Sequence, residues 1–374
     1  MQIIEKTYKG FVPSYPIDRF CDVNRALFID IETTGLKKET TSLYLIGCGF
    51  YTREGFETKL FFADSTSEEN LILEEFASFV KDYTHLFHFN GLKFDIPYLE
   101  YKAGLYGQCP LFTGIEQIDV YKLCKPLRYL LFPESMRQKA IEAFLQIERE
   151  DMYSGGELIE VYKSYEITKS PDDLNLLVTH NREDVLGMHL IMPILSYIDF
   201  KDAPLDYIGY TINEYKDYSG CTCEEVIFDY STTLKFPRSF TARTESMYVR
   251  ASASDGRIAI RLPLYTNDMK IFFDNYRDYF YLPEEDTAIL KSAAMGLPKE
   301  RYHKATKETC YTRVSGKFLK QPSDLFTPVV KAAYKDKKNY FCFPDSFNEK
   351  AADEFGRQLI NVFFSMKKHL SLPL

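Results

Sequence analysis

The order of apolar and polar residues predicts five β-strands in the first third of the chain. The runs are short, rich in apolar and β-branched side chains, and separated by polar turns. The predicted strands are Leu27–Ile31, Leu43–Tyr51, Lys59–Ala63, His85–Phe89 and Gln117–Val120.

Helical periodicity follows these strands. One helix is predicted from about Ser67 to Asp82, and a second has Pro97 in its first turn and runs to about Lys102. From about residue 120 to residue 198 the pattern stays helical, with breaks at Ser154-Gly155-Gly156 and at Ser170-Pro171. Strands that come first and then alternate with helices predict an α/β fold, in which helices flank a mixed five-stranded sheet.

The pattern changes near Asp202-Ala203-Pro204, where short alternating runs joined by turns begin. Helices are expected to return at about Glu284–Ala294 and Asn348–Lys368. We therefore expect two domains, residues 1–200 and a smaller, β-rich α+β domain of residues 201–374. The strands predicted in the second domain are Val226–Phe228, Met247–Ala251, Ile258–Leu262, Lys270–Phe273 and Tyr279–Leu282.

Composition narrows the class of protein. Hydrophobic residues make up 45% and charged residues 27% of the chain, which is typical of a soluble globular protein. The net charge of -8 argues against binding polyanions over the whole surface but allows a local basic patch. The cysteines lack zinc-site spacing, so free thiols in a reducing compartment are expected. With no signal-peptide pattern or membrane-length apolar run, we expect a cytoplasmic protein without a membrane partner.

The first predicted strand ends in the segment Asp30-Ile31-Glu32-Thr33-Thr34-Gly35. Because side chains alternate across a strand, Asp30 and Glu32 should emerge on the same face. Two carboxylates side by side at the end of a buried strand are energetically costly unless a cation lies between them. The pair therefore suggests a metal site, although it also fits a strand end whose acids meet solvent.

Two further acids strengthen the metal hypothesis. Asp95, in the segment His88–Leu99, lies just past a predicted strand at the start of a helix. The alternative for Asp95 is an N-cap or first-turn acid that the helix dipole stabilises. Asp184 follows His180 by four residues in the helical segment His180-Asn181-Arg182-Glu183-Asp184, so the two side chains share a helix face. The structural alternatives are an exposed acid for Asp184 and a capping or surface role for His180.

These motifs, in this order, resemble the DEDD superfamily of 3′→5′ exonucleases on the RNase H-like fold. That family has D-x-E on its first strand, an N-x-x-x-F-D-type second motif and a final aspartate on a late helix. The resemblance covers about residues 24–198 and is closest to the bacterial YprB-type branch, which the segments Ile147–Asp151 and Gly155-Gly156-Glu157 also resemble. It implies that Asp30, Glu32, Asp95 and Asp184 hold two divalent ions, Mg²⁺ or Mn²⁺, which hydrolyse a phosphodiester at a nucleic-acid 3′ end.

Elementary electrostatics agrees with that implication. Carboxylates within about 5 Å of one another repel by roughly 3 kcal/mol per pair at an effective dielectric constant near 20. Without a cation, some of them would have to take up protons through raised pKa values. Hard divalent ions remove the conflict because they favour carboxylate and water oxygens, and a pair roughly 4 Å apart can activate water and stabilise the entering and leaving oxygens.

His180 departs from the superfamily pattern. The superfamily usually has a tyrosine four residues before its last acid or a histidine five residues before it. Here Thr179 stands five residues before Asp184, and the histidine stands four before. Since a histidine can orient or deprotonate a metal-bound water near neutral pH, we expect His180 to be catalytic as the general base.

Substrate contacts are expected from two turns. The resemblance implies that Thr33, Thr34, Gly35 and Leu36 approach the terminal nucleotide through backbone contacts and an apolar wedge; an ordinary glycine turn is the alternative. Asn90 is expected to reach the substrate end and Lys93 a phosphate, although Asn90-Gly91 also fits a simple turn and Lys93 a solvated surface position.

A basic and aromatic segment lies in the second predicted domain. Cations that meet phosphates, interleaved with aromatics that stack on bases, fit a single-stranded nucleic-acid surface, and the alternative is a solvated charged face. The basic residues are Arg301, Lys304, Lys307, Arg313, Lys317, Lys320, Lys331, Lys335, Lys337 and Lys338, and the aromatics are Tyr302, Tyr311, Phe318, Tyr334 and Tyr340.

The sequence thus predicts a metal-dependent 3′→5′ exonuclease acting on single-stranded DNA or RNA. An alternative from another class is a nucleic-acid-binding protein whose nuclease-like domain is weakly active or inactive. A third, a metal-dependent phosphatase for small phosphate esters, gains no support from a basic, aromatic second domain. Protein partners are not predicted.

Overall fold

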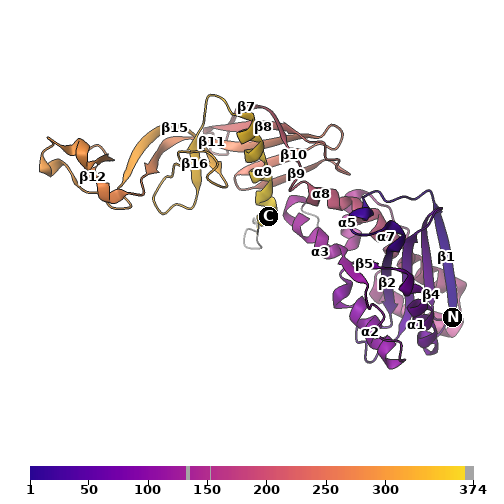
Figure 1. Ribbon diagram of the computed structural model, residues 1–374. Helices are drawn as coiled ribbons and strands as arrows, with labels where there is room; N and C mark the ends of the chain where they lie inside the picture. Colours follow the sequence, from indigo (N-terminus) through magenta and orange to yellow (C-terminus); the bar gives the residue numbers. More distant parts are fainter. Residues whose placement is uncertain (132–134, 152, 367–374) are drawn as a thin grey trace. The chain divides into compact units, whose positions relative to one another are not determined.

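The computed structural model describes residues 1–131, 135–151 and 153–366 (Figure 1). The chain divides into two compact units: residues up to Ile198, apart from Tyr129–Leu131, and those three residues together with the chain from Asp199 onward. Within the described residues no helix is long and apolar enough to cross a membrane. All eight cysteines are free thiols.

Unit 1 is built on a mixed sheet of six strands in the order β1-β4-β3-β2-β5-β6. The strands β1 to β4 pair antiparallel, whereas β5 runs parallel to β2 and β6 runs parallel to β5. The carboxyl ends of β2 and β5 therefore meet at the same edge of the sheet. The strands are β1 (Gln2–Lys9), β2 (Ala26–Thr33), β3 (Leu43–Tyr51), β4 (Gly55–Phe62), β5 (His85–His88) and β6 (Glu116–Asp119).

The five predicted strands of this unit are confirmed, but the predicted strand number is wrong because β1 was missed. Its residues are mostly exposed and polar, so they show no apolar alternation. β1 becomes a strand because its backbone pairs along the whole length of β4, from Gln2 opposite Phe62 to Lys9 opposite Gly55.

Helices cover both faces of this sheet (Figure 1). α1 packs on β3 and β4, while α7 packs on β2, β3 and β4 and is contacted by α5 and α6. The predicted breaks are helix starts: Ser154 forms a capping box with Glu157, and Ser170 caps α7 ahead of Pro171. The α-helices up to Asp199 are α1 (Glu69–Phe79), α2 (Asp95–Leu105), α3 (Val120–Cys124), α4 (Arg128–Leu131), α5 (Gln138–Leu145), α6 (Gly155–Thr168), α7 (Pro171–Ile191) and α8 (Ser196–Asp199). Of these, α4 lies mostly in unit 2, to which Tyr129–Leu131 belong.

Two glycines on β3 bring α7 unusually close to the sheet. A Cβ atom at Gly47 would lie 1.9 Å from Asn181 Oδ1, and one at Gly49 would lie 2.5 Å from Val185 Cγ1. Both distances are far shorter than van der Waals contact, so no larger residue fits at either position without displacing α7. This close approach sets the distance between the polar residues of α7 and those of β2.

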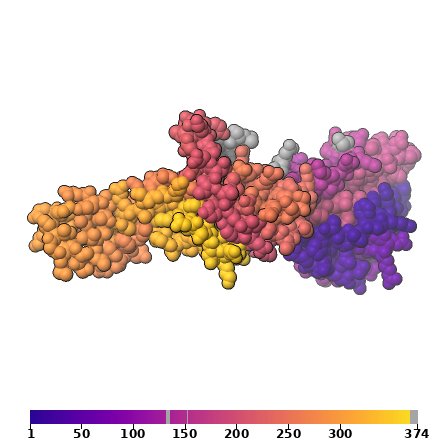
Figure 2. Space-filling view, turned by 90° about the horizontal axis from the view of Figure 1, so that it is seen from above, coloured from indigo at the N-terminus to yellow at the C-terminus, as the bar shows by residue number. Residues whose placement is uncertain are grey.

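Unit 2 contains a seven-stranded antiparallel sheet, a separate three-stranded sheet and one long helix. The three-stranded sheet, drawn in orange, lies at one end of the unit, beyond the long strands β11 and β15 (Figures 1 and 2). The elements are β7 (Asp206–Lys216), β8 (Thr222–Ser231), β9 (Phe240–Thr244), β10 (Met247–Ala251), β11 (Arg257–Phe272), β12 (Tyr279–Leu282), β13 (Thr287–Leu290), β14 (His303–Lys304), β15 (Tyr311–Gln321), β16 (Asn339–Cys342) and α9 (Glu349–Ser365).

Two predictions for this unit need correction. The helix expected at Glu284–Ala294 is wrong, because β12 and β13 pair there as a hairpin in which Asp286 takes a left-handed backbone conformation with φ +49°. The runs Ile258–Leu262 and Lys270–Phe273 are not two strands, since β11 is continuous from Arg257 to Phe272. Its first half pairs with β8 and its second half with β15. The predicted C-terminal helix is α9, and its expected end at Lys368 lies outside the described residues.

Candidate metal centre

The acidic pair lies on the sheet face that α7 covers. Asp30 pairs with Gly47 and Glu32 with Leu45 across β2 and β3, so both carboxylates point to the side from which α7 approaches Gly47. Glu32 is only 8% exposed, and Asp30 is partly buried. The two acids are therefore largely removed from water, and the alternative of a solvated strand end does not describe them.

Asn181 on α7 holds the Asp30 carboxylate in place. Its side-chain amide donates to Asp30 Oδ2 at 2.8 Å and to the Asp30 carbonyl oxygen at 3.3 Å. Asn181 is fully buried, and the missing side chain of Gly47 leaves room for its Oδ1 atom. The sequence pattern gives Asn181 no role, and its position next to His180 is the one local signal for it.

Asp95 joins the acidic pair from the neighbouring parallel strand. It is the first residue of α2, which follows β5, and β5 ends at the same edge of the sheet as β2. Burial raises the pKa of Asp95 to about 6, although backbone hydrogen bonds from Asp95 and Ile31 oppose the rise. The contact with Ile31, which stands between the two acids of β2, shows that the three carboxylates are neighbours.

The pKa values of the two acids of β2 are raised by burial and by the neighbouring carboxylates. Burial raises the pKa of Asp30 well above its usual value, and the charges of Asp184, Glu32 and Asp95 raise it further, while the Asn181 hydrogen bond lowers it. Burial also raises the pKa of Glu32, again helped by Asp184 and Asp95. Both shifts have the sign expected when carboxylates crowd a poorly solvated site without a cation.

Glu32, His180 and Asp184 form the tightest group at this site. One ligand atom from each lies within 4.8 Å of the other two. His180 Nε2 is 3.4 Å from Glu32 Oε1 and 3.3 Å from Asp184 Oδ2. The predicted ligand set thus differs from this group, because His180 is inside it whereas Asp30 and Asp95 stand beside it.

The donor set fits a divalent cation. Carboxylate oxygens are the ligands that Mg²⁺ and Mn²⁺ favour, and the repulsion between the carboxylates needs a positive charge for compensation. Two charged carboxylate oxygens within 4.8 Å of each other repel by at least about 3 kcal/mol at an effective dielectric constant near 20. Glu32, His180 and Asp184 are thus the residues that could hold a cation.

A segment before α6 brings one arginine to the last acid. Arg149 Nη2 donates to Asp184 Oδ1 at 2.6 Å, and Nη1 donates to Glu142 Oε2 at 3.0 Å. Burial alone lowers the pKa of Arg149, but Asp184 and Glu142 outweigh it, and the net shift is upward. Arg149 therefore remains a cation that fixes one oxygen of Asp184 and leaves Oδ2 directed at His180.

The same segment brings Asp151 to His180. The two side chains meet at 2.8 Å between Asp151 Oδ2 and His180 Nδ1, and Lys139 Nζ donates to the same carboxylate oxygen at 2.9 Å. Burial by itself raises the pKa of Asp151, but the hydrogen bond from Lys139, the His180 ring and the Tyr153 N–H together hold it below its usual value. In the sequence, Arg149 and Asp151 stand out only through the family resemblance, which predicts no role for them.

The predicted substrate turn is ordered by its own hydrogen bonds. The Thr33 hydroxyl donates to the Gly35 carbonyl at 2.8 Å, and the Thr34 hydroxyl accepts from the Ser42 N–H at 2.8 Å. These two hydroxyl groups therefore serve the turn, and so do the Thr34 N–H, which donates to the Ser42 carbonyl, and the Gly35 carbonyl, which also accepts from the Thr41 hydroxyl. Leu36, at 84% exposure, presents an apolar side chain to solvent.

Asn90 and Lys93 lie in the turn that leads to α2. Asn90 takes a left-handed conformation with φ +62°, and its N–H donates to Asp119 Oδ1 at 3.0 Å. Asn90 thus forms a turn, which was one of the two possibilities that the sequence allowed. Its side chain makes no capping hydrogen bond to the 3₁₀ turn that follows. Lys93 is exposed.

Three of the basic residues of the segment in unit 2 pair with acids as follows. Arg313 pairs with Asp268 at 2.7 Å, and Lys317 pairs with Glu224 at 2.7 Å. Lys335 pairs with Glu308 at 2.8 Å. These contacts neutralise part of the positive charge of the segment. The folded surface is therefore less basic than the count of lysines and arginines along the sequence suggests.

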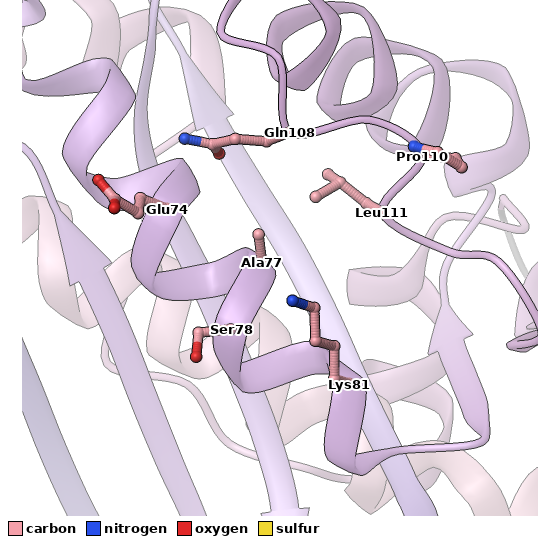
Figure 3. A pocket seen from close by; sticks show the side chains of 7 residues that line it. All are labelled: Glu74, Ala77, Ser78, Lys81, Gln108, Pro110 and Leu111. Atoms are coloured by element: carbon pink, nitrogen blue, oxygen red, sulfur yellow. The ribbon is translucent and has the colours of Figure 1, made fainter.

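A small pocket of about 280 Å³ lies between α1 and the segment after α2 (Figure 3). The Lys81 side chain points toward it beside Gln108 and Leu111. All of its lining residues are described, and none of them is a predicted site residue; they are Glu74, Ala77, Ser78, Lys81, Gln108, Pro110 and Leu111. The pocket is thus separate from the carboxylates.

A family model described as the RNase_H superfamily matches residues 27–196. The matched region starts in β2, ends after α7 and includes every acid of the site. Together with the mixed sheet and its flanking helices, the match confirms the predicted RNase H-like fold for this region, and a separate β-rich unit is present as predicted. No curated protein matches the chain.

Solved nucleases and a polymerase show a distant likeness. A family B DNA polymerase from the hyperthermophilic archaeon Pyrobaculum calidifontis is 14% identical, with TM-score 0.39 over 68% of this chain and 35% of that chain. E. coli exonuclease I bound to single-stranded DNA and zinc is 15% identical, with TM-score 0.27 over 55% and 54%. Its complex with a dT13 oligonucleotide is 13% identical, with TM-score 0.28 over 55% and 54%. The chain spans about half or less of these proteins, and at these scores the likeness says nothing about activity.

Proposed function

We propose that this chain is a two-metal-dependent 3′→5′ exonuclease that hydrolyses phosphodiester bonds of single-stranded DNA or RNA, with Mg²⁺ or Mn²⁺ as cofactor. The observation that supports this proposal most is the convergence of Glu32, His180 and Asp184 within 4.8 Å, flanked by Asp30 and Asp95. A buried cluster of mutually repelling carboxylates destabilises a protein unless it binds a cation. Such a cluster in a nuclease-type fold favours phosphodiester hydrolysis.

The proposed roles follow from the contacts of each side chain. Asp30, Glu32, Asp95 and Asp184 hold the metal ions, and Asn181 keeps one oxygen of Asp30 occupied so that the other is free. When bound, the ions supply Lewis acidity toward water and the scissile phosphate. His180 takes the proton of the attacking water at Nε2, the ring nitrogen that faces the acids.

Substrate binding is proposed at the turns beside the acids. The backbone of Thr33, Thr34 and Gly35 follows directly from Glu32, and the exposed Leu36 is suited to stack against or wedge beside a terminal base. Asn90 and Lys93 precede Asp95 and are proposed to contact the substrate end and a phosphate. These assignments extend the site from the metal ligands toward a nucleic-acid 3′ end.

The test is a cleavage assay on 3′- and 5′-labelled single-stranded DNA and RNA in Mg²⁺, Mn²⁺ or EDTA. We expect shortening from the 3′ end in metal, none in EDTA, and at least a 1000-fold slower rate for Asp30→Asn, which keeps size but removes a ligand charge. Asp82→Asn, at an exposed position of the same unit, is the matched control. Absence of metal-dependent shortening of every substrate would contradict the proposal.

One observation favours the alternative of a nucleic-acid-binding protein without turnover. Arg149 occupies Asp184 Oδ1 at 2.6 Å and so withdraws one of the oxygens that a second metal ion would use. In that case the labelled strands would be retained in a filter-binding assay with metal but would keep their length. Cleavage in the first assay excludes this alternative.

Finer assignments are part of the same proposal. We assign the chain to the YprB-type branch, because Arg149 and Asp151, which lie in one of the segments that carry that resemblance, contact Asp184 and His180. We propose residues 1–200 as the catalytic domain and 201–374 as an accessory nucleic-acid-binding domain. The location is proposed to be cytoplasmic.

A further inference from the structure

The imidazole ring of His180 is held from one side and faces the acids on the other. Its Nδ1 atom is 2.8 Å from Asp151 Oδ2, and its Nε2 atom is 3.4 Å from Glu32 Oε1 and 3.3 Å from Asp184 Oδ2. The side chains of His180 and Asp151 are 5% and 2% exposed. Water therefore contributes little to the orientation of this ring, and the contact with Asp151 is the shortest of the three.

The partners of Asp151 establish which atom carries the hydrogen in this contact. Lys139 Nζ donates to Asp151 Oδ2 at 2.9 Å, and the Tyr153 N–H donates to Oδ1 at 3.0 Å. Both oxygens of Asp151 thus already accept hydrogen bonds from donors that cannot act as acceptors. A carboxylate that is held in this way accepts from the ring, so the shared hydrogen resides on Nδ1 of His180.

We propose that Asp151 is a positioning residue that fixes His180 as the Nδ1–H tautomer with the Nε2 lone pair directed at Glu32 and Asp184. In a neutral imidazole one nitrogen donates and the other accepts, so a hydrogen on Nδ1 leaves Nε2 able to accept a proton or ligate a cation. A carboxylate behind a histidine fixes tautomer and orientation in this way at other metal sites. The tautomer itself does not depend on the proposed function. Only the role of the Nε2 lone pair in accepting a proton from water rests on it.

A purely structural role for Asp151 makes a different prediction. The Asp151 N–H donates to Glu183 Oε2 at 2.9 Å, and the Glu150 N–H donates to Glu183 Oε1 at 3.0 Å, so Glu183 anchors the same segment through its backbone. If Asp151 only anchored the segment, Glu183→Gln and Asp151→Asn would have the same consequences. If Asp151 orients the ring, only Asp151→Asn changes the tautomer. An ionised carboxylate can only accept a hydrogen bond from Nδ1–H, whereas the asparagine amide can also donate one to an unprotonated Nδ1.

The experiment is a long-range ¹H–¹⁵N correlation spectrum of the full chain labelled with ¹⁵N-histidine, in EDTA and at a pH where the ring is neutral. His180→Gln identifies the His180 signals. We expect the Nδ1–H tautomer in the wild type and in Glu183→Gln, and a mixture or the Nε2–H tautomer in Asp151→Asn. An Nε2–H tautomer in the wild type would overturn the inference whether or not Asp151→Asn folds.

Cleavage kinetics then separate orientation from substrate binding. Asp151→Asn is expected to lower kcat by about 10- to 100-fold with KM unchanged, and Asp151→Glu, which restores an acceptor, is expected to recover part of the loss. Unchanged kcat in Asp151→Asn, or an equal loss in Glu183→Gln, would count against a positioning role. If the wild type cleaves nothing, the proposed function fails, while the tautomer measurement still decides the inference.

Discussion

Replacing Asp95 by asparagine is expected to make the metal-free protein more stable, although it removes a proposed metal ligand. The pKa of Asp95 is raised by burial from 3.8 to about 6. Below pH 3.8 the carboxyl is protonated in both the folded and the unfolded chain, and above about pH 6 it is ionised in both. Between these values only the folded chain keeps the proton, so the contribution of this group to the free energy of unfolding decreases as pH rises.

The size of the effect follows from the two pKa values. Ionising a group with a folded-state pKa of about 6 instead of 3.8 lowers the free energy of unfolding by about 3 kcal/mol once the pH exceeds both. Asparagine is neutral at every pH and still offers a carbonyl oxygen to the backbone donors. At about pH 7.5 in EDTA, Asp95→Asn should therefore raise Tm by about 6 to 12 °C, which is an upper limit, and at about pH 4 the difference should vanish.

Thermal unfolding followed by circular dichroism between about pH 4 and pH 8 is the measurement. Asp82→Asn makes the same chemical change at an exposed site and should stay within about 0.5 kcal/mol of the wild type. A thousandfold excess of Mn²⁺ over Kd should reverse the order, because the wild type then gains about 4.1 kcal/mol and the variant lacks a ligand. An Asp95→Asn protein that is less stable than the wild type in EDTA at about pH 7.5, or equally stable, would refute the reasoning.

Three other predictions follow from the contacts of the site and of unit 2. Asn181→Ala removes the donor to Asp30 Oδ2 and should weaken Mn²⁺ binding about 10- to 100-fold by calorimetry; unchanged affinity would contradict the orienting role. Gly47→Ala puts a Cβ atom 1.9 Å from Asn181 Oδ1 and should lower the free energy of unfolding by about 1 to 3 kcal/mol in urea titrations. Charge reversal of Lys337 and Lys338 should weaken binding to a labelled single strand and flatten its salt dependence, and equal binding at all salt concentrations would exclude these residues from the interface.

The sequence allowed a good prediction of the unit 1 sheet because its strands are buried. Strands such as Leu27–Ile31 and Leu43–Tyr51 show dense apolar runs, since both faces of the sheet are covered by helices. The exposed edge strand β1 has no such pattern and was missed. The hairpin of β12 and β13 was mistaken for a helix, because pairing between strands, and not local periodicity, determines that segment.

For the site, the sequence by itself determined which acids exist and the elements that carry them, because alternation along a strand and spacing along a helix are local properties. It placed Asp30 with Glu32 and His180 with Asp184. Only the tertiary structure decided how these pairs meet: Gly47 lets α7 approach the sheet, Asn181 reaches Asp30, and Nε2 of His180 is directed at the acids. Contacts between residues far apart in the chain depend on how closely the helices and strands pack. A local sequence pattern does not determine the distance between two packed elements.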